Sequence, residues 1–196
     1  MLELDDNLLI GKGVIRSCYQ HPMKQNQCVK ILHPTSPLKN QTREIRYFKH
    51  LEKVGASWEY VVPFVKTEET NFGLGAVFNL VRDCDGKISK SIDFYLKQDI
   101  PEINNYIAYA LEELKQHLWE QNIIYRDLNP SNILLQKNSE TDFHLKVIDG
   151  VGHNDFIPIC HFAYFGRKKI ERMWNRRLRK WFGKYKNVFP LLTPYR

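Results

Sequence analysis

The stretch Ile123–Gln136, IIYRDLNPSNILLQ, constrains the fold more than any other part of the chain. It places Asp127 and Asn132 five residues apart, on either side of a Leu-Asn-Pro-Ser turn. An apolar run typical of a buried strand follows, and a second run, Leu145–Ile148, ends in Asp149. Two carboxylates and an amide at turns and strand ends are hard oxygen ligands. They suit Mg²⁺, which usually takes one or two protein carboxylates together with substrate phosphates.

The sequence YRDLNPSN resembles the catalytic loop of protein kinases, and the later VIDG resembles their metal-binding Asp-Phe-Gly motif. The resemblance implies that Asp127 accepts the proton of an attacking hydroxyl, while Asn132 and Asp149 hold the metal that bridges the nucleotide phosphates. The alternative is an Asp and an Asn that cap an ordinary turn. The order of the second strand and the second Asp favours the kinase interpretation. The chain is also similar to the YrbL family, small kinase-like proteins under PhoP control in Gram-negative bacteria.

Three positions depart from the kinase pattern. Asn129 stands where kinases acting on Ser/Thr usually carry a Lys that steadies the transferring phosphate, so activity is in doubt unless Lys12 or Arg16 supplies the charge. Gly150 follows Asp149 directly, so the Phe of the Asp-Phe-Gly motif is absent. Arg16 replaces the third glycine of the glycine loop, where it either adds a donor to the phosphates or narrows the pocket.

The nucleotide-binding residues are expected in the first half of the chain. Gly11, Lys12 and Gly13 form a turn whose backbone N–H groups could approach phosphates, although a plain hairpin explains them equally well. Lys30, in the strand Cys28–Leu32, resembles the kinase lysine that pairs with the α- and β-phosphates; the alternative is a solvent-facing strand residue.

The helix expected over Leu38–Val54 places Glu44 beside its apolar face, where the resemblance pairs it with Lys30; a solvated Glu is the alternative. Further strands are expected over Val61–Val65 and Gly75–Val81, and the backbone from Leu80 to Arg82 would then meet the adenine.

The C-terminal part is strongly basic. The net charge is +7, yet residues 161–196 carry eleven Lys/Arg against one Glu, a net of +10, which leaves −3 for residues 1–160. The segment 167–182 has an amphipathic pattern with Trp, Leu and Ile on one stripe. It either packs that stripe on the domain, lies on an anionic membrane surface, or collects an acidic substrate. No nucleic-acid motif accompanies the charge, so nucleic acid is not expected as a partner.

Location follows from the ends and the cysteines. The N-terminus has acids where a signal peptide would carry lysines, so export is not expected. The four cysteines form no C-x-x-C pair, which is typical of reduced thiols in a cytoplasmic protein. The protein is therefore expected in the cytoplasm, with a peripheral inner-membrane location if the basic helix binds lipid.

These observations predict one α+β, protein-kinase-like domain over residues 1–196. An N-lobe of five strands and one helix covers about 1–82, and a truncated helical C-lobe about 87–196, with a long helix over 101–121. The resemblance implies an ATP- and Mg²⁺-dependent phosphotransferase with a hydroxyl acceptor, which is expected to be a small molecule, a sugar or a lipid-linked compound in preference to a protein. The alternative is a nucleotide-binding pseudokinase that acts as a regulator or scaffold.

Overall fold

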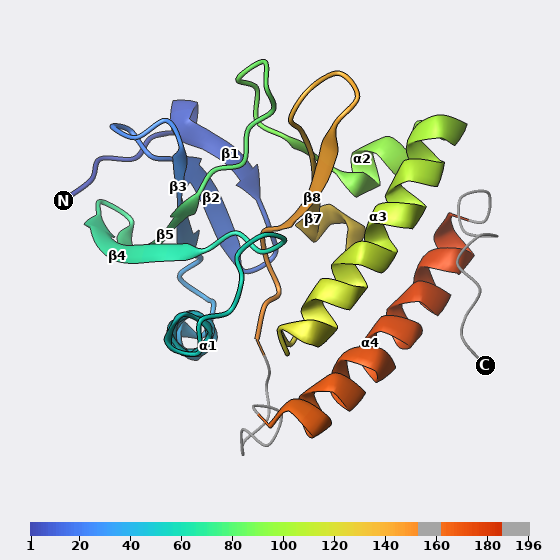
Figure 1. Cartoon of the computed structure of the whole chain (residues 1–196). Coiled ribbons are helices and arrows are strands. Elements are labelled where there is room, and N and C mark those ends of the chain that lie inside the picture. Colours follow the sequence, from blue (N-terminus) through green and yellow to red (C-terminus); the bar gives the residue numbers. More distant parts are fainter. Residues whose placement is uncertain (153–161, 186–196) are drawn as a thin grey trace.

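The computed structural model describes residues 1–152 and 162–185 (Figure 1). The first half forms a five-stranded antiparallel sheet in the order β1-β2-β3-β5-β4. Its strands are β1 (Leu9–Lys12), β2 (Arg16–Gln20), β3 (Gln27–Leu32), β4 (Phe64–Thr70) and β5 (Gly73–Asn79). A short 3₁₀ turn, η1 (Asp6–Leu8), precedes them. The predicted α+β fold class is confirmed, with helix α1 (Leu38–Lys53) between β3 and β4 in the chain.

Helix α1 follows the apolar pattern that predicted it. Phe48 and Leu51 are buried on its inner side, and Glu44 is buried on the same side. The helix ends before Gly55, whose φ of +70° suits a helix C-terminus. The buried face therefore presents one carboxylate to the interior.

The strand predicted over Val61–Val65 is wrong in its position. Strand β4 begins at Phe64 and continues through residues predicted as a connection, to a tight turn at Gly73 with φ of +97°. Val61 and Val62 are buried for another reason, because they pair with Val147 of the second sheet. The apolar run therefore joins the two halves of the molecule.

In the second half, the described residues form a three-stranded sheet in the order β6-β7-β8 and four helical segments. The elements are β6 (Lys90–Ser91), α2 (Ile92–Leu96), α3 (Pro101–Glu120), η2 (Pro130–Asn132), β7 (Ile133–Lys137), β8 (Phe143–Val147) and α4 (Ala163–Lys184). The long helix predicted from Pro101 is confirmed, with Ile107, Leu111, Leu114 and Leu118 fully buried. One continuous hydrophobic cluster runs from α1 through the catalytic-loop region to α4, so the two halves share a core.

The basic helix α4 lies alongside α3 in Figure 1 and buries its apolar stripe. Ile170, Trp174, Leu178 and Trp181 are all at most 4% exposed, whereas the side chain of Phe182 lies outside the described residues. These four residues of the predicted stripe thus pack on the domain. Within the described ranges, no helix has the length and apolarity to span a membrane.

Candidate active site

A cavity of about 360 Å³ lies between the turn that joins β1 to β2 and the loop after α3. Asp127, Asn132 and Asp149 all line it. The other lining residues are Gly13, Val14, Ile15, Arg16, Arg126, Asn129, Ser131 and Gly150. The structure therefore brings the three predicted oxygen-bearing side chains to one concave surface. Gly11, Lys12, Lys30, Glu44, Leu80 and Arg82 are not among the residues that line it.

Hydrogen bonds within the candidate catalytic loop and to Gly150 give the loop its shape. The backbone N–H of Arg126 donates to the Gly150 carbonyl at 2.6 Å, and that of Asp127 makes a longer contact with the same oxygen. The Asn132 amide nitrogen donates to the Asp127 carbonyl at 3.3 Å. The Asn129 side chain accepts from the Ser131 N–H at 3.3 Å, which caps the 3₁₀ turn η2. The loop is thus held by its own residues and by Gly150.

Gly150 is required at its position by both backbone and space. Its φ is +81°, a conformation that side-chain-bearing residues rarely adopt. A Cβ placed there would also lie 2.8 Å from the Asp127 carbonyl oxygen. The direct Asp149-Gly150 sequence, which departs from the kinase motif, therefore lets the strand end pass close to the catalytic loop.

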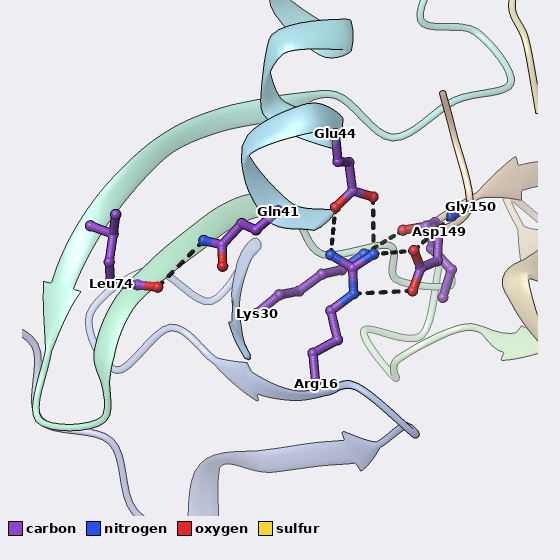
Figure 2. Close-up of polar contacts among 8 residues, drawn as sticks. Arg16, Lys30, Gln41, Glu44, Leu74, Asp149 and Gly150 are labelled. Carbon is purple, nitrogen blue, oxygen red and sulfur yellow. Dashed lines mark hydrogen bonds and ion pairs between the residues drawn. The ribbon is translucent and has the colours of Figure 1, made fainter. Parts of the chain in front are cut away.

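Arg16 is the residue whose role the sequence did not reveal. Figure 2 shows its guanidinium between two carboxylates. It donates to Glu44 through both terminal nitrogens, at 2.5 and 2.9 Å. It also donates to both oxygens of Asp149, with Nε to Oδ2 at 3.2 Å. Arg16 is only 8% exposed and Glu44 4%, so this is a buried cluster.

The charges of this cluster reinforce one another. Burial by itself would lower the pKa of Arg16, but the two carboxylates outweigh it and raise that pKa. Burial would likewise raise the pKa of Asp149, but the charges of Lys30 and Arg16, with hydrogen bonds from Arg16 and the Gly150 N–H, hold it at about 2. Asp149 is therefore a carboxylate at neutral pH. The sequence held one indication of this role. Glu44 and Asp149 were both expected to face inward, and Lys30 was the one cation expected beside them.

The expected pairing of Lys30 with Glu44 is wrong in this structure. Lys30 is buried, and its ammonium donates to the Ile148 carbonyl and lies 4.4 Å from the centre of the Phe78 ring. Glu44 pairs with Arg16 instead. The planar, forked guanidinium matches the two oxygens of a carboxylate better than an ammonium group does. Lys30 nevertheless contributes charge to Asp149.

The glycine turn is a tight hairpin. The Gly13 N–H donates to the Arg16 carbonyl at 2.8 Å, and Val14 at the tip is 96% exposed. Gly11 and Lys12 belong to β1. Of the three predicted phosphate-binding residues, only Gly13 lines the cavity.

The residues predicted to contact the adenine form hydrogen bonds within the protein. The Leu80 N–H donates to the Asn26 carbonyl at 2.8 Å, and the Arg82 carbonyl accepts from the Gln136 side chain at 2.9 Å. The Arg82 guanidinium donates to the Gln25 and Gly86 carbonyls. Their role in adenine binding stays a prediction.

The residues facing the cavity fit Mg²⁺ only with help from phosphate oxygens. Because the Asn132 amide nitrogen bonds to the Asp127 carbonyl, its Oδ1 is the atom left for a metal. The Asp149 carboxylate has about four acceptor positions, so Arg16 does not exhaust it. No group of three or more His, Cys, Asp or Glu side chains able to hold a metal occurs within residues 1–152 and 162–185.

A cation from a distant element also reaches the loop. Arg177 of α4 contacts Asp127, with Nη2 at 3.0 Å from Oδ1. The pattern of the basic helix identified Arg177 only as one charge among many.

Comparison with known proteins places the chain. Residues 2–181 match the family described as PhoP regulatory network protein YrbL. The chain belongs to this family. The uncharacterized protein YrbL of Escherichia coli (strain K12) is 30% identical over 184 residues, which cover 90% of this chain and 86% of that protein. The relative of the same name in Shigella flexneri gives the same figures.

Two kinases resemble this YrbL-family chain more distantly. The liver/testis isoform of the phosphorylase b kinase gamma catalytic chain of Bos taurus is 27% identical over 145 residues, covering 69% of this chain and 35% of that protein. The crystal structure of the PknI kinase domain of Mycobacterium tuberculosis shows 18% identity and a TM-score of 0.47 over 72% of this chain and 57% of that domain. The chain thus spans about a third of the first protein and somewhat more than half of the second.

Proposed function

We propose that this YrbL-family protein is an ATP- and Mg²⁺-dependent phosphotransferase whose acceptor is a hydroxyl. The observation that carries the proposal is the position of Asp127, Asn132 and Asp149 around one cavity beneath the Gly13 turn. The bovine kinase relative, matched over 69% of this chain, supports it. We also propose that residues 1–196 act as one domain, with the cavity between its two lobes.

Each of the three residues would have its own role in phosphate transfer. Asp127 accepts the proton of the acceptor hydroxyl, whose oxygen forms a bond to the γ-phosphorus of ATP. The bond from that phosphorus to the β–γ bridging oxygen breaks, and its electron pair leaves with ADP. Asn132 and Asp149 would hold Mg²⁺, which when bound neutralises charge on the phosphates. Asp149 is suited to this because its pKa of about 2 keeps it ionised.

Nucleotide binding would fall to the first half of the molecule. The Gly11-Lys12-Gly13 segment, of which Gly13 lines the cavity, together with the cation of Lys30, would lie against the phosphates. Glu44 would act through Arg16, which it holds, and the backbone near Leu80 and Arg82 would meet the adenine. For the acceptor, we propose a small-molecule, sugar or lipid-linked hydroxyl in preference to a protein.

The test is turnover of Mg²⁺-ATP by wild-type protein and by Asp127→Asn. We expect slow ADP release or autophosphorylation that Asp127→Asn lowers by about 10²- to 10⁴-fold, the usual size of a proton-transfer contribution. Glu140→Gln, an exposed carboxylate in the β7–β8 loop, is the matched control and should keep full activity. Equal activity in wild type and Asp127→Asn would refute the proposal.

A second candidate is a nucleotide-binding pseudokinase that acts as a regulator or scaffold. It is favoured by the Arg16 contacts to both oxygens of Asp149, which compete with a metal. The two functions separate cleanly. A pseudokinase would gain thermal stability with ATP yet release no ADP with any metal tested, whereas a phosphotransferase would release ADP only when Mg²⁺ is present.

We further propose that the protein acts in the cytoplasm, or at the inner membrane through outward cations of α4. Sedimentation with anionic vesicles tests the second location. Because Ile170, Trp174, Leu178 and Trp181 of α4 are buried, we expect such binding to depend on the outward cations. It should disappear as salt shortens the screening length from about 10 Å at 0.1 M to about 3 Å at 1 M.

A further inference from the structure

The contact between Arg177 and Asp127 is not explained by stability. The two side chains are 29% and 47% exposed, and they lie 3.0 Å apart. Exposed ion pairs of this kind contribute little to folding. The pair nevertheless places a guanidinium beside the carboxylate proposed to receive the acceptor hydroxyl.

The position of Arg177 is fixed by the way α4 is anchored. At one end, Arg167 lies 4.2 Å from the centre of the Trp119 ring, and Glu171 accepts from the Trp119 indole N–H at 3.2 Å. At the other end, Lys184 and Tyr185 both bond to Asp93 of α2. The buried stripe secures the middle of the helix. Arg177 is thus delivered by a rigid element and not by a loose arm.

The charge around Asp127 is cationic. Helix α4 carries nine Lys/Arg and one Glu, whereas residues 1–160 have a net charge of −3. Arg126 lines the same cavity as Asp127. Position 129 of the loop carries no cation. The side-chain oxygen of Asn129 accepts a hydrogen bond from the Ser131 N–H. Of these cations, Arg177 contacts Asp127 and Arg126 lines its cavity.

We propose that Arg177 binds an anionic group of the acceptor, so that the preferred acceptor is a hydroxyl compound that already carries a phosphate. A guanidinium has five N–H donors, so Arg177 can hold a phosphate oxygen while it keeps Asp127 in place. The phosphate chemistry is the same in a free sugar or polyol phosphate and in a phosphorylated lipid headgroup. This inference rests on the proposed phosphotransferase activity and adds the class of its acceptor.

The reaction then needs no further reactant. The hydroxyl oxygen of the phosphorylated acceptor bonds to the γ-phosphorus, its proton passes to Asp127, and ADP leaves with the electrons of the broken bond. The phosphate already on the acceptor stays intact and interacts with Arg177. Arg177 is accordingly a specificity residue, and its loss should appear in KM for the acceptor more than in kcat.

The experiment compares matched acceptors. Glycerol 3-phosphate and glucose 6-phosphate are set against glycerol and glucose, and phosphatidylinositol vesicles against vesicles of a neutral galactolipid that has hydroxyls but no phosphate, with transfer of labelled phosphate as the readout. Turnover of soluble phosphates identifies a free acceptor, and turnover confined to phosphatidylinositol identifies a lipid one. Equal turnover of the phosphorylated and neutral partners would overturn the proposal.

Two arginine variants distinguish a specific contact with the acceptor phosphate from general electrostatic attraction. Arg177→Gln should raise KM for the phosphorylated acceptor by about 10- to 100-fold, the value of a charged hydrogen bond. Arg176→Gln removes the same charge from an exposed position on the same helix and should change KM less than about twofold at 0.15 M salt, where such charges are screened. Equal losses in both variants would contradict a specific contact.

Calorimetric titration with glycerol 3-phosphate in the absence of ATP makes the test independent of turnover. Heat of binding that is lost in Arg177→Gln and kept in Arg176→Gln supports the anion site even if the protein transfers no phosphate. Turnover without phosphate preference would leave the phosphotransferase standing and remove the anion site. Melting temperatures of both variants should match wild type, since the pair is exposed.

Discussion

The catalytic loop and the buried Arg16 cluster face each other across the cavity but are built in different ways. The loop holds Asp127 and Asn132 through hydrogen bonds within residues 126–132 and to Gly150. The cluster joins Arg16 to Glu44, 28 residues away, and to Asp149, 133 residues away. A motif can therefore encode the first, whereas the second exists only once the sheet, α1 and the end of β8 are packed together. Changes in the cluster should cost more stability than changes in the loop.

The largest effect is expected from breaking the buried pair. Glu44→Leu should lower the free energy of unfolding by about 3 kcal/mol or more, because it leaves the charge of Arg16 buried with one partner fewer. Urea unfolding measures this. The double variant Arg16→Met/Glu44→Leu should recover a large part of the loss, since an apolar replacement of both partners is often tolerated. Losses that simply add would mean that the two side chains are not coupled.

The next effect belongs to the loop side. Gly150→Ala and Gly86→Ala place the same methyl group at the same φ of +81°. Only the first meets the chain, 2.8 Å from the Asp127 carbonyl oxygen; nothing lies within 4 Å of the second. We expect Gly86→Ala to cost about 1 kcal/mol from backbone strain, and Gly150→Ala to cost clearly more and to impair phosphate transfer. Equal melting temperatures of the two variants would show that Gly150 is required only for its positive φ.

Acid should weaken the cluster in a defined window. The folded pKa of Asp149, about 2, lies below its ordinary value of 3.8, so the unfolded protein binds a proton more readily than the folded one. The stabilisation is present above pH 4 and is lost as pH falls from 4 to 2. It should amount to at most about 2 kcal/mol, because one unit corresponds to about 1.4 kcal/mol and the side chain is partly exposed.

Acid unfolding of Asp149→Asn should therefore be shallower than that of wild type over this range. Asp93, which ties α2 to α4, also has a pKa of about 2: the bonds from Lys97, Tyr185 and Lys184 outweigh the opposing effect of burial. Asp93→Asn removes a similar slope at a site remote from the cavity. If Asp93→Asn made the unfolding free energy less dependent on pH but Asp149→Asn did not, Arg16 would not depress the pKa of Asp149.

The smallest effect is expected at Asn129. Asn129→Ala removes the acceptor for the Ser131 N–H and should cost about 0.5–1 kcal/mol, whereas Asn129→Ser keeps a capping oxygen and should cost less. Thermal unfolding by circular dichroism resolves the two. A loss as large as that of Glu44→Leu would remove the contrast between a local loop and a long-range cluster.

Elements with a strong local pattern could be predicted well. The helices from Leu38 and Pro101 appear within one residue of their expected ends, and Asp127, Asn132 and Asp149 meet as the motif implied. The strand expected over Val61–Val65 could not be placed, because burial of Val61 comes from pairing with Val147 and not from β4. An apolar run reports that a segment is buried but not what buries it.

The sequence by itself determined the turn between Asp127 and Asn132 and the amphipathic faces of the helices, because each depends on neighbours a few residues away. Only the tertiary structure decided which cation meets which carboxylate. It paired Glu44 with Arg16 in place of Lys30, and it brought Arg177 to Asp127. The physical reason is that an ion pair depends on distances between separately folded segments and on the shape of the cation, and neither is written in the spacing of residues along the chain.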